Sequence, residues 1–374
     1  MKGSIRQRSK GTWQLRYDAP PDGTGRRRFV SKTFKGNKKD AERALRELLA
    51  TIENGGYVAS DKETVAQFMV RWLETYAATN TNRKTQQGYR GLIDRYLTPY
   101  LGNIKLQDLT ARRIQALYAD MHSRGLGAPS IVATHRVLKE ALGHAVRWSV
   151  ITRNVADAAT PPRIERKTMP MWDVAEINRF LDATANDHFY PVYHLAILTG
   201  LRRSEIFGLK WDAIDLAGST LQVVRTLQRI TDYGLVEGQP KTQRSRRSIS
   251  LPPAAVELLH GVRGTQMEHK LSHGELWSNT GYVFTQMDGS PTDPDRVSKE
   301  FPKLVRVHGL PHLTFHGLRH AHATLALSAG VNPKIVSERL GHSSIAVTMD
   351  IYSHVLPGMQ EEAALAVENL LERA

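Results

Sequence analysis

The chain has 374 residues, with 51 Lys and Arg against 37 Asp and Glu, and a net charge of +14 at pH 7. This length allows two or three domains with cores of their own, and the positive charge favours a polyanionic partner, nucleic acid above all. The absence of cysteine excludes disulfides and Cys-based zinc sites. Neither a signal peptide nor a membrane-spanning stretch is evident, so we expect a cytoplasmic protein with no membrane partner.

Residues 1–60 predict a small basic domain. The stretches 12–17 and 26–34 alternate as strands do, and the Pro- and Gly-containing segment 20–25 lies between them as a turn. A helix is expected from about 38 to 53, ahead of two glycines. Trp13, Tyr17 and Phe34 are assigned to the core of this domain, because large aromatic side chains are usually buried.

Residues 61–158 predict a helical bundle. Apolar residues recur at helical spacing over 64–76, 85–97, 110–122 and 130–150, and 101–110 forms a loop. Thr64, Thr110 and Ser130 stand where N-caps are expected. The stretch 154–167 contains two prolines and is interpreted as a linker to the remaining domain, 165–374.

Two segments early in this last domain contain candidate functional residues. In TGLRRSE at 199–205, Gly200 is expected to end an apolar helix. Arg202 and Glu205 are three residues apart at the start of the next helix, so the carboxylate can hold the guanidinium. Lys241 precedes an alternating strand at 246–252, which predicts a lysine on a hairpin tip that can reach into a groove.

Two further segments follow. TFHGLRH at 314–320 opens a helix on which His316 and Arg319 point the same way. LGHSS at 340–344 and DIYSH at 350–354 place His342 before a short helical stretch and Tyr352 just beyond it, where a nucleophile can be mobile. A final run, 360–372, has an apolar stripe and several Glu and predicts a tail helix.

These residue types fit phosphoryl transfer without a metal, which needs a nucleophile, an acid for the leaving oxygen and several fixed cations. A phenol is only about 0.1% ionised at neutral pH, so a tyrosine nucleophile also needs a base and a positive field. The candidates are Arg202, Lys241, His316, Arg319, His342 and Tyr352. Over about 165–360 the segments resemble the catalytic domain of the tyrosine recombinases, the phage integrase family.

The resemblance implies a reaction. Tyr352 would attack the scissile phosphate and form a 3′-phosphotyrosyl link, His316 would take the tyrosine proton, and Lys241 would protonate the leaving 5′-oxygen. No cofactor and no metal is implied.

Three other side chains would bind the phosphate in the same resemblance. Arg202 and Arg319 would clamp the nonbridging oxygens, and His342 would donate a hydrogen bond. Gly317 departs from the pattern, because many relatives have an acidic residue after the histidine, and this puts a supporting carboxylate in doubt.

The remaining domains resemble the arm-binding domain and the core-binding, SAM-like bundle of larger integrases. The implied fold is mainly α with small β-sheets: an N-terminal three-stranded sheet plus helix, a helical bundle and a mixed α+β catalytic domain. Relatives often pass such a tail helix to a neighbouring protomer, and packing on its own domain is the alternative. Candidate DNA contacts are Arg6, Arg8, Lys10, Arg26, Arg28, Arg83, Lys84, Arg136 and Lys139.

We expect a site-specific recombinase that integrates or excises a phage or mobile element. Its partners would be double-stranded attachment sites, a homotetramer at synapsis, and host bending and directionality factors. The alternatives are a Xer-like resolvase, an enzyme like the type IB topoisomerases, and a regulator that binds DNA without cutting it. A zinc site at His316 and His320 is disfavoured because no third ligand is evident.

Overall fold

A computed structural model describes residues 3–19, 28–53, 62–165, 170–240 and 245–352, with the side chains of 19, 28, 51–53 and 350–352 also left undescribed. The chain divides into two compact units, Met1–Arg166 and Lys167–Ala374. Each unit is described by itself. The predicted tail helix at 360–372 lies outside the described residues.

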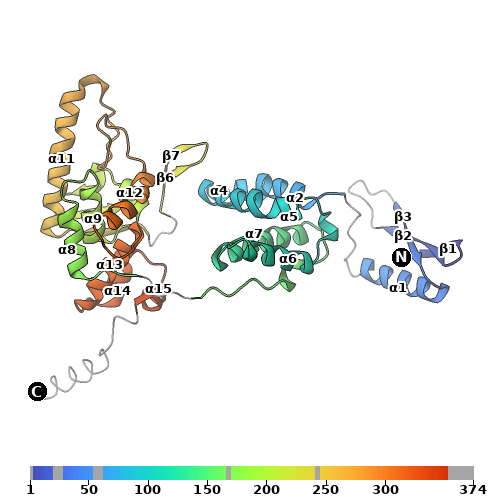
Figure 1. The fold of residues 1–374 in the computed structure, drawn as a ribbon. Helices are drawn as coiled ribbons and strands as arrows, with labels where there is room; N and C mark the ends of the chain where they lie inside the picture. Colours follow the sequence, from blue (N-terminus) through green and yellow to red (C-terminus); the bar gives the residue numbers. More distant parts are fainter. Residues whose placement is uncertain (1–2, 20–27, 54–61, 166–169, 241–244, 353–374) are drawn as a thin grey trace, which may run out of the picture. The chain divides into compact units, whose positions relative to one another are not determined.

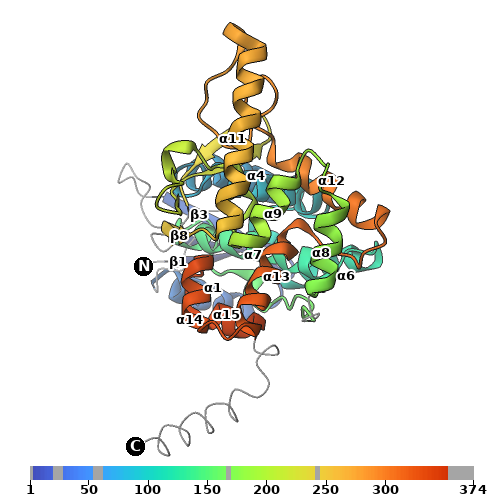
Figure 2. The same ribbon diagram turned by 90° about the vertical axis from the view of Figure 1, so that its left-hand side faces the viewer.

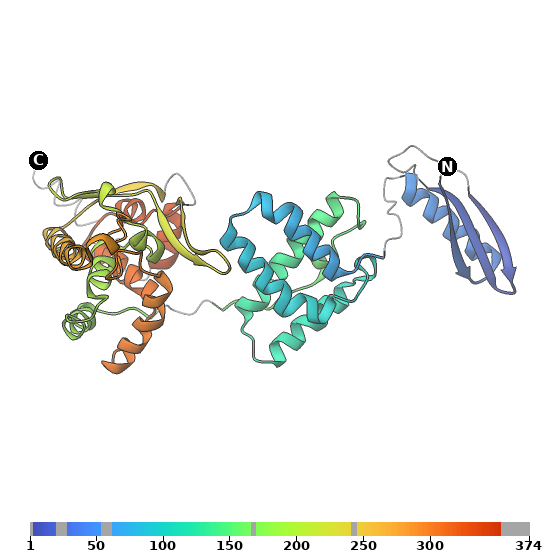
Figure 3. The ribbon, with the colours of Figure 1, turned by 90° about the horizontal axis from the view of Figure 1, so that it is seen from above.

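The first unit begins with an antiparallel sheet of β1 (Gly3–Ser9), β2 (Thr12–Ala19) and β3 (Arg28–Lys35), in that order. Helix α1 (Lys38–Glu53) lies along one face of the sheet, as Figure 3 shows. Leu15 and Tyr17 are buried under this helix, and Trp13 and Phe34 pack against them. The predicted sheet, helix and aromatic core are therefore confirmed.

A helical bundle completes the unit. The first two predicted helices, 64–76 and 85–97, each continue through a π-helical turn and are therefore made of several shorter elements. The elements are α2 (Val65–Trp72), η1 (Leu73–Ala77), α3 (Ala78–Asn80), α4 (Arg83–Leu92), η2 (Ile93–Leu97), α5 (Thr98–Leu101), η3 (Leu106–Asp108), α6 (Ala111–Ser123), α7 (Ala128–Arg147) and η4 (Val155–Ala158).

Two sequence-based expectations in the bundle need correction. Thr64 and Thr110 are N-caps as predicted, but Ser130 lies inside α7, whose N-cap is Gly127. Pro129 explains the earlier start, because proline is favoured in the first turn of a helix. The start of the predicted linker is also part of the bundle, since Ala156 and Ala159 are buried in its core.

The second unit is mixed α and β (Figure 1). A sheet of order β4-β5-β8 is accompanied by the separate β6–β7 hairpin. The elements are α8 (Val174–Ala183), α9 (Tyr190–Thr199), α10 (Arg203–Phe207), η5 (Trp211–Ala213), β4 (Ile214–Asp215), β5 (Thr220–Val223), β6 (Thr226–Ile230), β7 (Gly234–Gly238), β8 (Arg247–Ser250), α11 (Pro253–His273), η7 (Gly274–Leu276), α12 (Pro294–Val307), α13 (Phe315–Ser328), α14 (Pro333–Leu340) and α15 (Ile345–Tyr352).

The packing of this unit brings distant segments together. Helix α9 has apolar residues on all sides and packs against α10, α11 and α13 in one large core. Figure 2 shows α9 beside α11 and α13. Helix α14 packs against α13, α15 and strand β8. The C-terminal ends of α9 and α14 and the start of α13 consequently meet beside the start of α10. This junction contains most of the candidate residues.

Candidate active site

Arg202 is positioned by the turn between α9 and α10. Helix α9 ends at Gly200, whose φ of +66° favours glycine, and a Cβ there would lie 2.5 Å from the His322 ring. Arg202 Nη1 donates to Glu205 Oε1 over 2.7 Å, as the spacing predicts, and Nη2 donates to the Gly341 carbonyl over 3.0 Å. The guanidinium is thus fixed between two elements 139 residues apart.

Glu205 is held by two arginines. Its side chain is 2% exposed, and Arg247 donates to both carboxylate oxygens over 2.9 and 3.2 Å. Desolvation raises the pKa of Glu205, but the hydrogen bond and charge of Arg247 and the charge of Arg202 outweigh it, so the net pKa is lowered. Glu205 is therefore ionised at neutral pH and orients Arg202.

Arg247 joins the strand β8 to this network. Its Nε donates to the Arg339 carbonyl over 2.6 Å, and a Cβ at Gly341 would meet its guanidinium at 2.9 Å. The alternating pattern at 246–252 places this residue in a strand but indicates no role for it. Its importance depends on Glu205, 42 residues away, which no local pattern indicates.

Replacing Arg247 with Met is expected to lower the free energy of unfolding by about 3 kcal/mol, because it leaves a buried carboxylate with only one of its two cationic partners. Urea denaturation followed by tryptophan fluorescence measures this loss. Arg225→Met is the matched control: it breaks ion pairs with two exposed carboxylates, Asp212 and Glu237, and is expected to cost about 1 kcal/mol or less. Equal losses in the two variants would contradict the central role of Arg247.

Arg319 is buried, with 3% of its surface exposed, near the start of α13. Its Nη1 donates to the Gly200 carbonyl and its Nη2 to the Leu340 carbonyl, each over 2.7 Å. Both acceptors lie at the C-terminal ends of helices, whose carbonyls need partners and attract cations. The guanidinium therefore ties the end of α9 to the end of α14, next to Arg202.

Two histidines lie in the field of these arginines. His316 is exposed at the start of α13, and desolvation together with the charges of Arg319 and Arg202 lowers its pKa. His342 follows the left-handed Gly341 that ends α14, and burial and the same two arginines lower its pKa to about 4. Both rings are neutral at pH 7, so each has one nitrogen that can accept a proton.

The structure describes Lys241 and Tyr352 less fully. Lys241 lies outside the described residues, between β7 and β8. The expected hairpin tip at Lys241 therefore stays a prediction; among the described strands, β7 and β8 belong to different sheets, and the tip of the β6–β7 hairpin lies at 231–233. Tyr352 is the last residue of α15 rather than just beyond it, and its side chain lies outside the description. The structure therefore brings together Arg202, His316, Arg319 and His342.

The buried ring of His322, which lies against Gly200, predicts how stability depends on pH. Its Nδ1 bonds to the Ile197 carbonyl, and burial is the main reason why its pKa falls to about 4. The unfolded chain takes up this proton near pH 6.5 and the folded chain only near pH 4, so stability is lost as pH falls through this window, by about 3 kcal/mol at most for this group. Urea midpoints at pH 7.5, 6 and 5 measure the slope.

His322→Leu is expected to reduce this slope in part, because His342, with a pKa also lowered to about 4, contributes to it as well. His312→Gln, at an exposed position, is expected to leave it unchanged. A midpoint that does not move between pH 7.5 and 5 would contradict the assignment.

The candidate DNA contacts lie in the first unit. Arg6, Arg8 and Lys10 are exposed on or beside β1; Arg26 and the side chain of Arg28 lie outside the described residues. Arg83 and Lys84 are exposed at the start of α4, and Arg136 is exposed on α7. Lys139 forms an ion pair of 2.9 Å with Asp157.

Arg16 is a candidate that the sequence interpretation missed. Its neighbours Leu15 and Tyr17 face α1, so strand alternation places Arg16 on the face of the sheet without the helix. There its guanidinium lies 4.7 Å from the centre of the Phe29 ring, which is 57% exposed. The alternation that predicted the strands could also have identified this residue.

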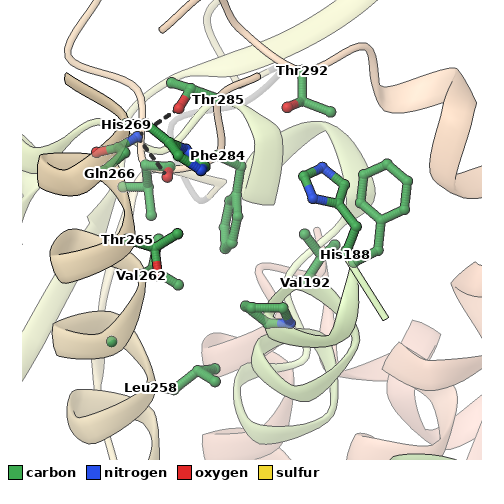
Figure 4. A pocket seen from close by; sticks show the side chains of 14 residues that line it. His188, Val192, Leu258, Val262, Thr265, Gln266, His269, Phe284, Thr285 and Thr292 are labelled. Atoms are coloured by element: carbon green, nitrogen blue, oxygen red, sulfur yellow. Dashed lines mark hydrogen bonds between the residues drawn. The ribbon is translucent and has the colours of Figure 1, made fainter. Parts of the chain in front are cut away.

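A separate cavity of about 280 Å³ lies between the start of α9, helix α11 and the segment 283–292. Figure 4 shows Val192, Leu258, Val262 and Phe284 around it, with Gln266 at one side hydrogen-bonded to Thr285. It contains none of the six candidate residues, and its lining is mostly apolar.

Comparison with known proteins decides the family. The phage integrase family matches residues 170–359, and its N-terminal SAM-like domain matches residues 64–122. The chain belongs to the phage integrase family. It is a site-specific DNA recombinase of the tyrosine type, as the four motifs predicted.

Relatives and solved structures agree with this membership. A tyrosine recombinase XerC-like protein of Caldanaerobacter subterraneus subsp. tengcongensis is 30% identical, covering 92% of this chain and 93% of its own length. The ICEBs1 integrase of Bacillus subtilis is 28% identical over 76% of this chain and 77% of its own. The Tn1549 transposon integrase in complex with transposon right end DNA shares the fold, with a TM-score of 0.68 and 24% identity over 82% of this chain and 99% of that chain. Among the described helices, none is both long and apolar enough to cross a membrane.

Proposed function

We propose that the recombinase cuts and rejoins attachment-site DNA through a 3′-phosphotyrosyl intermediate, and so integrates or excises a phage or mobile element. The observation that carries this proposal is the junction of α9, α10, α13 and α14, where hydrogen bonds hold two guanidinium groups close enough to two histidines to lower the pKa of both rings. Such an arrangement is preorganised for a pentavalent phosphate with its extra negative charge.

In the cleavage step, the Tyr352 oxygen attacks phosphorus and the bond to the 5′-oxygen breaks. The phenol proton passes to His316, whose lowered pKa keeps its ring neutral before the reaction. The leaving 5′-oxygen takes a proton from Lys241. Rejoining reverses these transfers, with a 5′-hydroxyl as the attacking group.

Three other side chains neutralise the negative charge of the phosphate. Arg202 and Arg319 donate to the nonbridging oxygens, and His342 donates a further hydrogen bond. Their preorganisation comes from Glu205 and from the helix-end carbonyls, so the cations need not be reoriented as charge develops.

The remaining domains would bind DNA outside the scissile phosphate. We assign residues 1–60 to accessory arm sites, 61–158 to the core site, and 165–374 to catalysis, with the enzyme acting in the cytoplasm as a synaptic tetramer helped by host bending and directionality factors. A lambda integrase tetramer bound to a Holliday junction, with a TM-score of 0.60 over 93% of this chain and 94% of that chain, supports the tetramer. In the first unit of this chain, the sheet and the helical bundle both have exposed cations that can contact phosphates.

Covalent trapping tests the central claim. The protein is incubated in EDTA with nicked duplexes carrying candidate attachment sequence, and the denatured products are resolved. We expect an adduct joined to the 3′-phosphate end of the cut strand, a free 5′-hydroxyl on the other fragment, and a DNA-modified peptide containing Tyr352 in mass spectrometry. Binding to a verified site without any adduct would favour the non-cutting regulator instead.

Arg16→Ala is expected to weaken binding to arm-site DNA and to lower the salt dependence by about one phosphate contact. The reason is its place on the open sheet face beside Phe29. Titrations at two or more salt concentrations measure both quantities. Arg43→Ala, on α1 and 66% exposed, is the control and should leave them unchanged. An unaltered salt slope for Arg16→Ala would contradict a phosphate contact.

A further inference from the structure

Helix α15, which ends in Tyr352, makes a polar contact with the turn that contains His342. The His342 Nδ1 and the Thr348 Oγ1 are 2.8 Å apart, a normal hydrogen-bond distance. Thr348 is fully buried, and α15 packs against α14. A buried hydroxyl and a ring nitrogen therefore link the nucleophile's helix to the proposed phosphate ligand.

This bond differs from that of other buried helical threonines in the chain. The hydroxyls of Thr134 and Thr199 donate to the carbonyls of Ser130 and Leu195, four residues back. The bond seen for Thr348 instead runs six residues back, to a side chain. Its hydroxyl is thus directed at the ring rather than at its own helix.

The direction of the bond follows from the chemistry of the site. A neutral imidazole has one N–H and one acceptor nitrogen, and a phosphate oxygen only accepts. Since Nδ1 is engaged by Thr348, Nε2 is the nitrogen left to meet the phosphate, so Nε2 must have the proton. Nδ1 then accepts, and the Thr348 hydroxyl donates.

We propose that Thr348 is a positioning residue that holds His342 as the Nε2–H tautomer, oriented to donate to the scissile phosphate. The proposal rests on the proposed function for the identity of the phosphate. Burial and the neighbouring cations Arg319, Arg202 and Arg247, together with His320, keep the ring from gaining a second proton. Without a fixed donor, the ring could adopt the other tautomer, which would turn a lone pair toward the phosphate.

The contact also links two parts of the reaction. Thr348 lies one helical turn before Tyr352 on α15, so the same side chain that orients His342 lies in the helix of the nucleophile. Docking of α15 and the correct histidine tautomer are therefore achieved together. A displaced α15 would lose both at once.

Two variants of similar size separate the hydroxyl from packing. Thr348→Val keeps the branched shape and removes the donor, whereas Thr348→Ser keeps the donor and loses a methyl group. We expect adduct formation to fall roughly 10-fold in Thr348→Val and to stay within about 3-fold of wild type in Thr348→Ser, with DNA affinity unchanged in both. Equal loss in both folded variants, or wild-type rates in Thr348→Val, would overturn the proposal.

A tautomer measurement provides a readout that does not depend on activity. Full-length protein with ¹⁵N-labelled histidine is examined by long-range ¹H–¹⁵N correlation, and the His342 signals are identified by their loss in His342→Gln. We expect an Nε2–H pattern in wild type and in Thr348→Ser, and a shift toward Nδ1–H or a mixture in Thr348→Val. An Nδ1–H pattern in wild type would overturn the inference; an Nε2–H pattern without adduct on a verified site would instead count against the proposed function.

Discussion

Tyr352→Phe is expected to abolish covalent adduct formation, with a loss of at least about 10⁴-fold in the cleavage rate. The substitution removes one oxygen, the atom that forms the bond to phosphorus, and keeps the aromatic ring at the end of α15. The guanidinium groups and histidines of the junction remain, so DNA affinity is expected to be unchanged. Gel resolution of denatured products measures the adduct, and a mobility-shift titration measures binding.

Tyr233→Phe is the matched control. Tyr233 is 58% exposed at the tip of the β6–β7 hairpin, in the same unit as Tyr352. Losing its hydroxyl should leave the adduct yield at the wild-type level. An undiminished adduct in Tyr352→Phe would assign the nucleophile to another of the 12 tyrosines of the chain.

Local patterns predicted a large part of the fold and of the site. The helix at 38–53 has the predicted bounds because its apolar spacing and the following glycines are short-range signals. The Arg202–Glu205 pair is also local, since a spacing of three at a helix start brings two side chains together. Gly200 ends α9 in the left-handed conformation for the same kind of reason.

The parts that could not be predicted depend on contacts between distant segments. Arg319 bonds to the Gly200 carbonyl, 119 residues away. The residues around Arg319 in the sequence therefore do not indicate that its side chain is buried and joins two helix ends. Arg247 on β8 reaches Glu205 on α10 across 42 residues of chain, a contact that only the tertiary packing of this unit creates. The cap of α7 was misplaced for a different reason: Ser130 is a good cap residue, but Pro129 already favours an earlier first turn.

Arg319→Lys is expected to lower the cleavage rate about 100- to 1000-fold, the usual loss when one fixed donor to a developing oxyanion is removed. An ammonium retains the charge but lacks the planar fork that spans two carbonyls. The Gly200 and Leu340 carbonyls would therefore no longer be joined, and the ends of α9 and α14 would lose their common partner. Single-turnover cleavage measures the rate, and urea denaturation measures stability separately.

Arg179→Lys provides the comparison, because Arg179 also donates to a backbone carbonyl, that of Gly309, but at the exposed surface. It should leave both the rate and the stability near wild type. The two roles of Arg319 are separated by what Arg319→Lys loses. A fall in stability alone would mean that Arg319 only joins the two helix ends. A fall in cleavage rate at unchanged DNA affinity would mean that its guanidinium stabilises the transition state. We expect both losses, since the carbonyls that hold the guanidinium also fix where its positive charge lies relative to Arg202.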